Sequence, residues 1–353
     1  MQVKKSFMKN VITGAAFLGS GGGGSIQAGK ALLKECRGKS FTLIHKKEMD
    51  DSMLICSLAD FGSISSFESG QKAALLSAFS AMKEIAESKY GKKISAIFPI
   101  ETGPENSIAP VLVSSYTGIP LLDVDSAARA VPALNLLSLA RSDSTDICAS
   151  NEKSELIILK NCSVERAESL LGLISSDKNF ASSSSISLYL SPYKKIKNQL
   201  IAGSYTRSAK YGKEIRKVKK EKRKVIIKKL KALNAHLLAE GQVIDIQSSI
   251  SNSLDTMKIS ISGTDKNLYT ILAVNENMIL YSSNSNHPIM LAPHSIAYLK
   301  NDASPMTNSE IQLKDNILLF AIPAHKKLLK IQNNYSMFLQ SMGYFGKKTF
   351  TFK

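Results

Sequence analysis

Residues 96–125 read AIFPIETGPENSIAPVLVSSYTGIPLLDVD, and this stretch decides the fold. The apolar run 96–100 predicts a β-strand, residues 108–116 predict a helix that ends at Gly118, and residues 119–122 predict a second strand. A strand, a helix and a strand in this order form a βαβ unit, in which the two strands are parallel. Ligands of open α/β sheets bind at the carboxyl ends of such strands. The stretch therefore predicts an α/β domain and the sheet edge at which a functional site forms.

Carboxylate and amide side chains follow both predicted strands. Glu101 comes directly after the first strand, and Asn106 lies in the turn behind it. Asp123 and Asp125 come after the second strand. A carboxylate that is partly removed from water near other acids has a raised pKa, which suits proton transfer, so Glu101 is the first catalytic candidate. The two aspartates are candidates to orient the other groups. Carboxylates in this position also bind metal ions or cap a helix, and we assign no metal ligand.

The sequence GSGGGGS at residues 19–25 is a second candidate for ligand binding. It lies between residues 7–16 and 26–36, whose apolar residues recur with helical spacing. Its glycines match G-x-G-x-x-G, but a dinucleotide-binding loop follows a strand and precedes an acidic residue, where His45 stands here. Exposed N–H groups before a helix bind anions and carbonyl oxygens, although a tight turn between packed helices is the alternative. The predicted ligand contacts are Gly21, Gly22, Gly23, Gly24 and Ser25.

Strand and helix signals alternate over the first part of the chain. Further strands are predicted at 41–44, 53–58 and 155–160, and further helices at 68–90, 126–140 and 164–175. This alternation predicts a three-layer α/β domain with a largely parallel sheet over residues 1–165.

Most of the net charge of +17 comes from one segment. Residues 194–231 contain 16 Lys and Arg but only Glu214 and Glu221 as acids, which gives this segment +14. Together with the Ser-rich stretch 181–187, it forms a predicted connector and basic helical arm over residues 166–240. A solvated helix is one interpretation, and binding to a polyanion, an acidic partner or a membrane surface through residues 194–231 is the other.

The hydrophobic period changes to two after Gly241. Short strands are predicted at 243–246, 257–261, 269–274, 278–281, 296–299 and 317–322. Residues 241–353 therefore form a predicted β-rich domain, either a sandwich or a small barrel. One of its turns contains Asn275, Glu276 and Asn277, and this turn either faces the ligand or has ordinary turn chemistry. Asn275 is the predicted ligand contact.

The composition indicates a soluble protein of the cytoplasm. No apolar run reaches the roughly 20 residues that a membrane-spanning helix requires. The basic N-terminus is followed by an interrupted apolar region, which argues against a cleaved signal peptide. Four cysteines are widely spaced and are interpreted as reduced thiols: Cys36, Cys56, Cys148 and Cys162.

Five motifs, in order along the chain, resemble those of one bacterial and archaeal family. They are GAAFLGSGGGGS (14–25), PIETGPENS (99–107), IPLLDVD (119–125), LAVNEN (272–277) and SMGYFG (341–346). This family, long catalogued as a domain of unknown function, is grouped with S-methyl thiohydantoin desulfurase and is often associated with hydantoinase and oxoprolinase genes. The resemblance covers nearly the whole chain, and the first two motifs are specific to the family.

The resemblance implies an N-terminal α/β domain, a C-terminal β-rich domain and hydrolysis of a hydantoin-like or thiohydantoin-like cyclic amide. By motif position it points to Gly21–Gly24, Glu101, Asn106, Asp123 and Asp125. The chain departs from the family pattern after D-x-D, where glycines and an aromatic residue are usual. Ser126, Ala127, Ala128 and Val131 stand there instead, and His45 replaces an acidic residue. These departures bear on the substrate and on whether activity is retained.

Two hypotheses follow. In the first, the protein hydrolyses a small cyclic amide or thioamide: Glu101 activates water, Asn106 and the glycine-loop amides hold substrate oxygens, and the two aspartates orient them. In the second, it is a catalytically degenerate binding protein whose basic arm meets an acidic partner or an anionic surface. Glu101 beside the glycine loop in an open cleft favours the first hypothesis, and a filled cleft favours the second. The sequence leaves the cofactor unknown and the substrate and self-association open.

Overall fold

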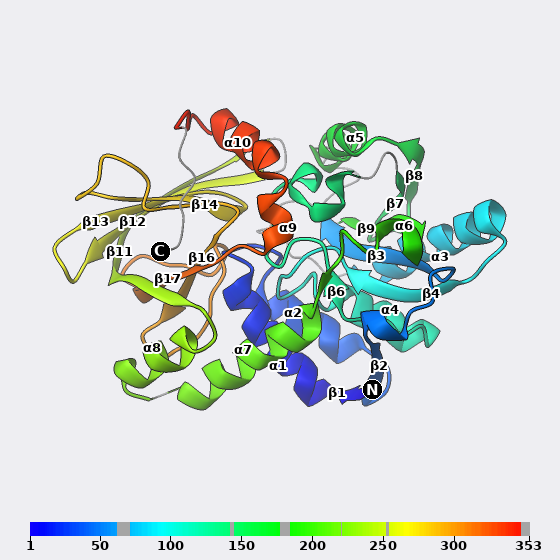
Figure 1. Cartoon of the computed structure of the whole chain (residues 1–353), viewed down its shortest axis with the longest axis horizontal. Coiled ribbons are helices and arrows are strands. Elements are labelled where there is room, and N and C mark those ends of the chain that lie inside the picture. The colour runs from blue at the N-terminus through cyan, green and yellow to red at the C-terminus, as the bar shows by residue number, and fades with distance from the viewer. Residues whose placement is uncertain (62–70, 142–144, 177–183, 220, 252–253, 347–353) are drawn as a thin grey trace.

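A computed structural model describes residues 1–61, 71–141, 145–176, 184–219, 221–251 and 254–346 of the chain. The first half of the chain forms an α/β unit around one sheet, and the second half adds an antiparallel sheet beside it (Figure 1). None of the described helices has the length and apolar character needed to cross a membrane.

The N-terminal sheet has eight strands in the order β1-β2-β5-β4-β3-β9-β7-β8. These strands are β1 (Gln2–Lys4), β2 (Ser40–Ile44), β3 (Leu54–Phe61), β4 (Ile94–Pro99), β5 (Leu121–Leu122), β7 (Thr145–Asn151), β8 (Leu156–Cys162) and β9 (Ser184–Pro192). The neighbours β2, β5, β4 and β3 are parallel, which confirms the predicted α/β sheet. Antiparallel strands extend it on both sides, so the whole sheet is mixed.

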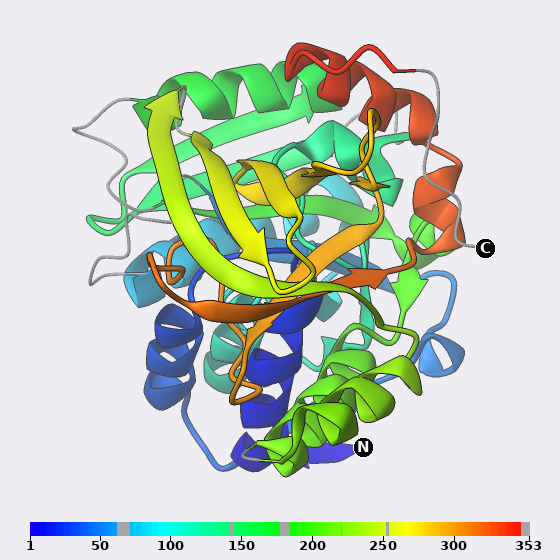
Figure 2. The ribbon, with the colours of Figure 1, turned by 90° about the vertical axis from the view of Figure 1, so that its left-hand side faces the viewer.

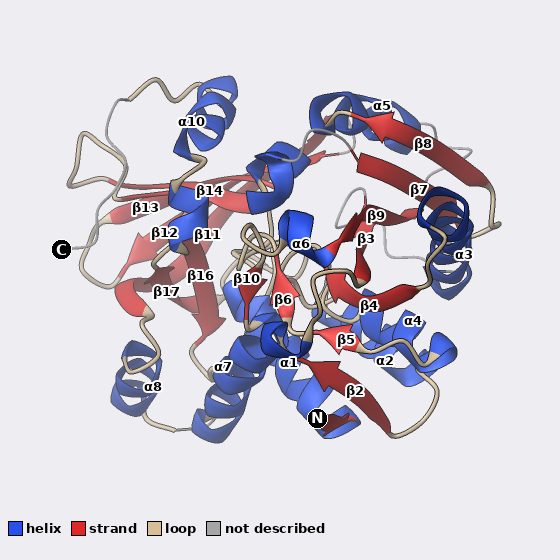
Figure 3. Cartoon of the chain, turned by 45° about the vertical axis from the view of Figure 1, so that its right-hand side comes forward, coloured by secondary structure: helices blue, strands red, loops and turns tan. Residues whose placement is uncertain are grey.

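Side chains that alternate along the strands fill two cores, one on each face of this sheet. In β3, Cys56 and Leu58 face one core while Ile55 and Ala59 face the other. One face is covered by α1 (Lys5–Leu18), α2 (Ile26–Glu35), α3 (Gln71–Tyr90) and α4 (Ala109–Thr117). The opposite face is covered by α5 (Val164–Ser176), α6 (Tyr193–Ile196) and irregular segments (Figure 3). The predicted three-layer arrangement is therefore confirmed.

The central βαβ unit has the predicted form. Strand β4, helix α4 and strand β5 follow one another, and Ile97 pairs with Leu121 in parallel register. Gly118 ends the helix in the left-handed conformation, with φ of 73°, which glycine adopts without steric cost. The carboxyl ends of β4 and β5 consequently open at the same edge of the sheet.

The helix predicted over residues 126–140 is wrong. Only the short 3₁₀ turns η2 (Leu134–Leu136) and η3 (Ser138–Arg141) form there. The carboxylate of Asp125 accepts hydrogen bonds from the N–H groups of Ala127 and Ala128, and Ala128 takes a positive φ of 58°. This turn ends any helical path, and Pro132 adds a residue without an N–H group.

The predicted Ser-rich connector is also wrong where it is described. Residues 184–187 belong to β9, which lies between β3 and β7 inside the sheet. Buried serine hydroxyls there are hydrogen bonded; Ser185, for example, donates to Asp60 at 2.5 Å. Residues 181–183 of the connector and 68–70 of the predicted third helix lie outside the described residues.

The basic segment forms two main helices, of which the first packs on α1 of the N-terminal domain and the second packs mainly on the C-terminal sheet. Helix α7 (Ser204–Val218) crosses α1 so closely that a Cβ on Gly14 would lie 1.8 Å from the carbonyl oxygen of Ser208. Helix α8 (Arg223–Lys231) buries Ile226 and Leu230 and turns most of its basic side chains to solvent. The helical prediction is confirmed, and the apolar face of the arm is part of the core.

The C-terminal sheet is antiparallel, with seven strands in the order β15-β14-β13-β12-β11-β17-β16. They are β11 (His236–Ser251), β12 (Leu254–Gly263), β13 (Leu268–Val274), β14 (Glu276–Ser282), β15 (Met290–Leu291), β16 (Ser295–Lys300) and β17 (Asn316–Ile322). The sheet curls until β16 approaches β14, so it is a half-barrel around an apolar core (Figure 2). The β-rich domain is confirmed, and its six predicted strands all form.

The last helices, α9 (Lys326–Leu329) and α10 (Gln332–Ser341), join the two halves of the molecule. The hydroxyl of Tyr335 donates to the carbonyl of Leu136 at 3.0 Å, and the amide of Asn334 donates to Asn135 at 2.7 Å. A small two-stranded sheet of β6 (Val124–Asp125) and β10 (Ile201–Ala202) leads from the βαβ unit into α7.

Candidate functional site

The glycine loop lies where the two domains meet, and other parts of the chain touch its backbone. A Cβ on Gly22 would fall 1.9 Å from Oε1 of Glu276, and one on Gly24 would fall 2.1 Å from Oε2 of Glu105. A Cβ on Gly23 would lie 2.5 Å from the Cα of Gly103. Real Cβ atoms do not approach so closely, so a side chain at any of these positions would displace its neighbour. Gly23 and Gly24 also have φ of 74° and 85°, which favours glycine at both. The loop thus brings two carboxyl groups against its main chain.

Glu101 is buried at this junction, with 5% of its surface exposed. Its Oε1 accepts a hydrogen bond from Nδ2 of Asn106 and its Oε2 accepts one from the N–H of Val131, both at 2.8 Å. Burial raises the pKa of Glu101 to about 7, against the lowering effect of these hydrogen bonds and of the Arg129 charge. The carboxyl group is therefore suited to exchange a proton near neutral pH.

Glu276, at the start of β14, lies in the turn that the sequence placed as a possible ligand contact, but no role in the site was predicted for its carboxyl group. It is 2% exposed, and one of its carboxyl oxygens, Oε2, has no hydrogen-bond partner among the described residues. Burial, and then the negative charge of Glu101, raise the pKa of Glu276 well above its ordinary value. Glu276 is the central residue of the N-E-N sequence in the LAVNEN motif, so the motif was the available signal.

Arg129 holds the two domains together beside this pair of glutamates. The guanidinium is fully buried and donates to the carbonyl oxygens of Ala130 at 2.8 Å, His294 at 2.9 Å and Asn277 at 3.0 Å. Its charge lowers the pKa of Glu101 and of Glu276, opposing the effect of burial. An arginine in this position favours a single negative charge on the pair.

Asn106 connects Glu101 to a second pair of buried acids. Its Oδ1 accepts from the N–H of Asp60 at 2.8 Å, while its Nδ2 serves Glu101. Burial raises the pKa of Asp60 to about 7, and burial followed by the Asp60 charge raises the pKa of Glu105 to about 8. Gln71 donates to Glu105. Four acids thus lie around the turn after β4. Glu101 and Glu105 belong to this turn, whereas Asp60 and Glu276 come from other strands and are brought to it by the fold.

Asp123 and Asp125 have other partners. Asp123 accepts hydrogen bonds from the N–H groups of Tyr205 at 2.8 Å and Thr206 at 3.2 Å, and from the Thr206 hydroxyl at 2.7 Å. It therefore caps helix α7, and Nδ1 of His45 lies 3.3 Å away. Asp125 accepts from the hydroxyl of Thr102 at 2.5 Å and from main-chain N–H groups.

Asn275 and the remaining loop residues also have internal partners. The Oδ1 of Asn275 accepts from the N–H of Asp255 at 2.8 Å, and its carbonyl accepts from Asn308 at 2.8 Å. Ser25 caps α2 by accepting from the N–H of Ala28 at 2.9 Å. Gly21 lies against the Asn308 side chain. Within the described parts of the chain, no group of three or more His, Cys, Asp and Glu side chains is arranged to hold a metal ion.

Family comparison covers almost all of this structure. The model described as "S-Me-THD-like, N-terminal domain" matches residues 7–161, and that described as "S-Me-THD-like, C-terminal domain" matches residues 164–347. The chain belongs to the S-Me-THD-like family. The resemblance inferred from the five motifs is confirmed.

A solved structure shares the fold of this S-Me-THD-like protein over its whole length. The crystal structure of a protein from Chromobacterium violaceum superposes with a TM-score of 0.84 at 20% identity, covering 98% of each chain. At this identity the likeness establishes the fold alone. No curated protein matches the sequence.

Proposed function

We propose that the protein hydrolyses a small cyclic amide or thioamide of the hydantoin or thiohydantoin type, with Glu101 as acid–base group. The observation that carries this proposal is the pKa of Glu101, raised by burial to about 7, beside Glu276 and the glycine loop. Family membership supports the substrate class. A general base works best when its pKa is near the operating pH.

The chemistry needs one base and one acid. For an S-methyl thiohydantoin, water forms a C–O bond at the ring carbon that bears sulfur, and the C–S bond breaks. One proton of water ends on the departing methanethiol and the other on the ring nitrogen, so neither oxidant nor reductant is required. Ionised Glu101 accepts a proton from the water, and protonated Glu276 supplies one to the departing thiolate. As the C=O bond forms, the second water proton moves to the ring nitrogen, and Glu101 returns its proton to Glu276, which restores the pair. Two neighbouring carboxyl groups with separated pKa values suit such paired roles.

The surrounding groups have positioning and electrostatic roles in this proposal. Asn106 fixes the Glu101 carboxylate through its 2.8 Å hydrogen bond. Arg129 balances the single negative charge of the pair. The N–H groups of Gly22, Gly23 and Ser25 already donate to Gly19, Glu276 and Glu105, so within the loop Gly21 and Gly24 are the candidate donors to substrate oxygens. Asp123 and Asp125 orient the site indirectly, through helix α7 and the turn at Thr102.

The test is a panel of hydantoins, thiohydantoins and their S-methyl forms, with release of thiol and ring opening measured for the wild type and Glu101→Gln. Glutamine keeps the size of the side chain and cannot take the proton, so turnover should fall by about 10²–10⁴-fold. Glu168→Gln is the matched control: burial raises the pKa of Glu168 to about 7 as well, but it contacts Leu134 instead of the glycine loop. Turnover that survives in Glu101→Gln and fails in Glu168→Gln contradicts the assignment.

A second candidate, binding to an acidic partner or an anionic surface, is favoured by one observation. The basic side chains of α8, including Lys224, Lys228 and Lys229, are exposed on one side of the molecule. Affinity that falls steeply as salt increases would support it. Glu101 and Glu276 are almost fully buried, and neither lines the cavity between the two domains. An open cleft at Glu101 therefore does not favour hydrolysis over this candidate, and an inactive substrate panel would leave it in place.

A further inference from the structure

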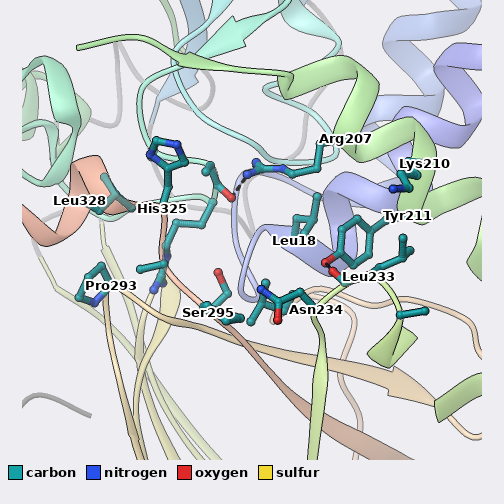
Figure 4. Close-up of a pocket in the computed structure, with 17 residues that line it drawn as sticks. Leu18, Arg207, Lys210, Tyr211, Leu233, Asn234, Pro293, Ser295, His325 and Leu328 are labelled. Carbon is teal, nitrogen blue, oxygen red and sulfur yellow. Dashed lines mark hydrogen bonds between the residues drawn. The ribbon is translucent and has the colours of Figure 1, made fainter. Parts of the chain in front are cut away.

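A cavity of about 390 Å³ lies between the two domains, next to the glutamate pair and separate from it. Its wall is formed by residues 127–129 from the first domain, by α7, by the connector at 232–234 and by residues 322–325 after β17 (Figure 4). Glu101, Glu276 and the four loop glycines are absent from this wall as described. Cavities of roughly 300–1,000 Å³ are the usual size of small-molecule sites.

One side of the cavity is positively charged. Arg207 and Lys210, one turn apart on α7, line it together with His325 (Figure 4). No aspartate or glutamate belongs to the described residues of the wall. The nearest acid to Arg207 is Asp125, which is fully buried behind it, 3.7 Å from Nη2. An anion in the cavity would therefore meet two cations without a facing carboxylate.

Arg207 is only partly satisfied by the protein. Its Nη2 donates to the carbonyl of Ala128 at 2.9 Å and to the hydroxyl of Thr102 at 3.3 Å. Its Nε is buried and has no hydrogen-bond partner among the described residues. Buried donors without partners are rare because leaving one unsatisfied costs about 1–3 kcal/mol. Arg129 also borders the cavity, but three main-chain carbonyls already accept from its guanidinium.

Other residues of the wall are apolar. They are Leu18, Leu233, Pro293, Ile322, Pro323 and Leu328. Such a surface favours an organic group over a bare inorganic ion, because apolar area removed from water stabilises the complex by about 25 cal/mol per Å².

We propose that this interdomain cavity binds a small organic carboxylate, with its charged end at Arg207 and Lys210 and its apolar body against Leu18, Leu233 and Leu328. This goes beyond the proposed hydrolysis, since the site uses neither glutamate of the pair. A bound carboxylate would share Arg207 with Asp125 and Thr102, at the turn that leads from Glu101. The cavity is thus placed to hold a second ligand close to the junction of the domains.

Hexanoate is the test ligand, with hexanamide as its neutral match and inorganic phosphate as an anion without an apolar body. Calorimetric titration of the full-length protein at low salt should detect hexanoate and show hexanamide at least about tenfold weaker. Lys210→Gln should weaken hexanoate several-fold and Arg207→Gln about tenfold or more. Lys213→Gln, an exposed lysine on α7 that does not line the cavity, should leave the affinity unchanged.

Several results would overturn the proposal. One is absence of hexanoate binding at tens of millimolar, and another is equal affinity for hexanamide. If Lys213→Gln lowers the affinity for hexanoate as much as Lys210→Gln does, hexanoate binds the general basic surface instead of the cavity. If phosphate binds more tightly than hexanoate, the apolar residues of the wall do not contribute to binding. Thermal melting checks that each variant folds. Arg207 is paired with the buried Asp125, so Arg207→Gln can prevent folding. In that case the affinity of Lys210→Gln for hexanoate tests the proposal by itself.

Discussion

Glu101 and Asp123 follow neighbouring parallel strands, and their environments are opposite. Glu101 accepts two hydrogen bonds, and burial raises its pKa to about 7. Asp123 accepts three hydrogen bonds at the start of α7 and has His45 beside it. Both side chains are almost fully buried. The difference lies in the number and kind of donors around each carboxylate.

This comparison separates two uses of an acid at a strand end. A carboxylate that meets several N–H and O–H donors in the interior is stabilised in its charged form and fixes a neighbouring element. A carboxylate buried beside another acid is destabilised in its charged form and can exchange protons. Glu276 makes the second case stronger, since burial and then the Glu101 charge raise its own pKa.

The largest effect on folding should come from Asp123→Ala. The substitution removes the acceptor for Tyr205 and Thr206 and leaves buried N–H groups without partners, which cost about 1–3 kcal/mol each. We expect the free energy of unfolding to fall by about 3–5 kcal/mol, measured by urea denaturation. Turnover per folded molecule should fall far less than in Glu101→Gln, because Asp123 acts on the site only through α7. A loss of turnover without a loss of stability would remove the distinction between the two acids.

The next effect concerns stability against pH. The pKa of Glu105 is 4.5 ordinarily and about 8 in the folded protein, so the folded state holds a proton that the unfolded chain releases. Its contribution to stability is complete below pH 4.5 and is lost as pH rises to about 8, at about 1.4 kcal/mol per pH unit for one group. Glu105→Gln should therefore flatten this decline.

Glu87→Gln on the exposed side of α3 is the control for that measurement. It should leave the pH dependence of the unfolding free energy as in the wild type. Parallel curves for Glu105→Gln and the wild type between pH 5 and 8 would mean that Glu105 does not hold a proton in the folded state.

Much of this fold was predictable because local patterns agree with it. The βαβ unit, both helices around the glycine loop and the strands of the second domain follow directly from hydrophobic period and from residues such as Gly118. The turn at Asp125 was not predictable, since its hydrogen bonds to Ala127 and Ala128 override an apolar helical pattern. Strand β9 was missed because serine is unusual inside a sheet, and the hydroxyls of Ser184 and Ser185 are satisfied by residues of the neighbouring strand β3.

The candidate site was predictable only in part. Glu101 and Asn106 come from one motif, and the structure joins them by a hydrogen bond. Glu276 comes from the other domain, and no local pattern indicates that its carboxyl group packs on Gly22. The domain limits at residues 165 and 240 stay a prediction; the family models divide the chain between residues 161 and 164, and β9 extends the first sheet to Pro192.

A smaller effect than these is expected in the pH dependence of turnover. Glu101 must be ionised to act as a base, so kcat/KM should rise about tenfold per pH unit below the pKa of about 7 and then level off. A decline at higher pH should follow as the pair loses the proton assigned to Glu276. Because the two groups interact, the two midpoints belong to the pair. A flat profile from pH 5 to 9 would contradict the assignment of both roles.

The smallest effect on stability should come from the exposed surface of α8. Changing Lys222, Lys224, Lys228 and Lys229 together to Gln removes four exposed charges that carry no described ion pair. Exposed charges contribute little to folding, so the unfolding free energy should change by less than about 1 kcal/mol. Binding to heparin or to anionic vesicles, if it occurs through this face, should weaken strongly, and the wild-type affinity should fall steeply with salt.

The control for this experiment changes the same number of charges elsewhere. Gln at Lys34, Lys39, Lys93 and Lys153, all exposed and outside the basic helices, gives the same net charge as the α8 variant. If the α8 face binds the polyanion, only the first variant loses affinity, because the local density of cations sets the interaction. Equal losses in the two variants would mean that net charge alone is responsible. Wild-type binding that does not respond to salt would exclude the electrostatic contact altogether.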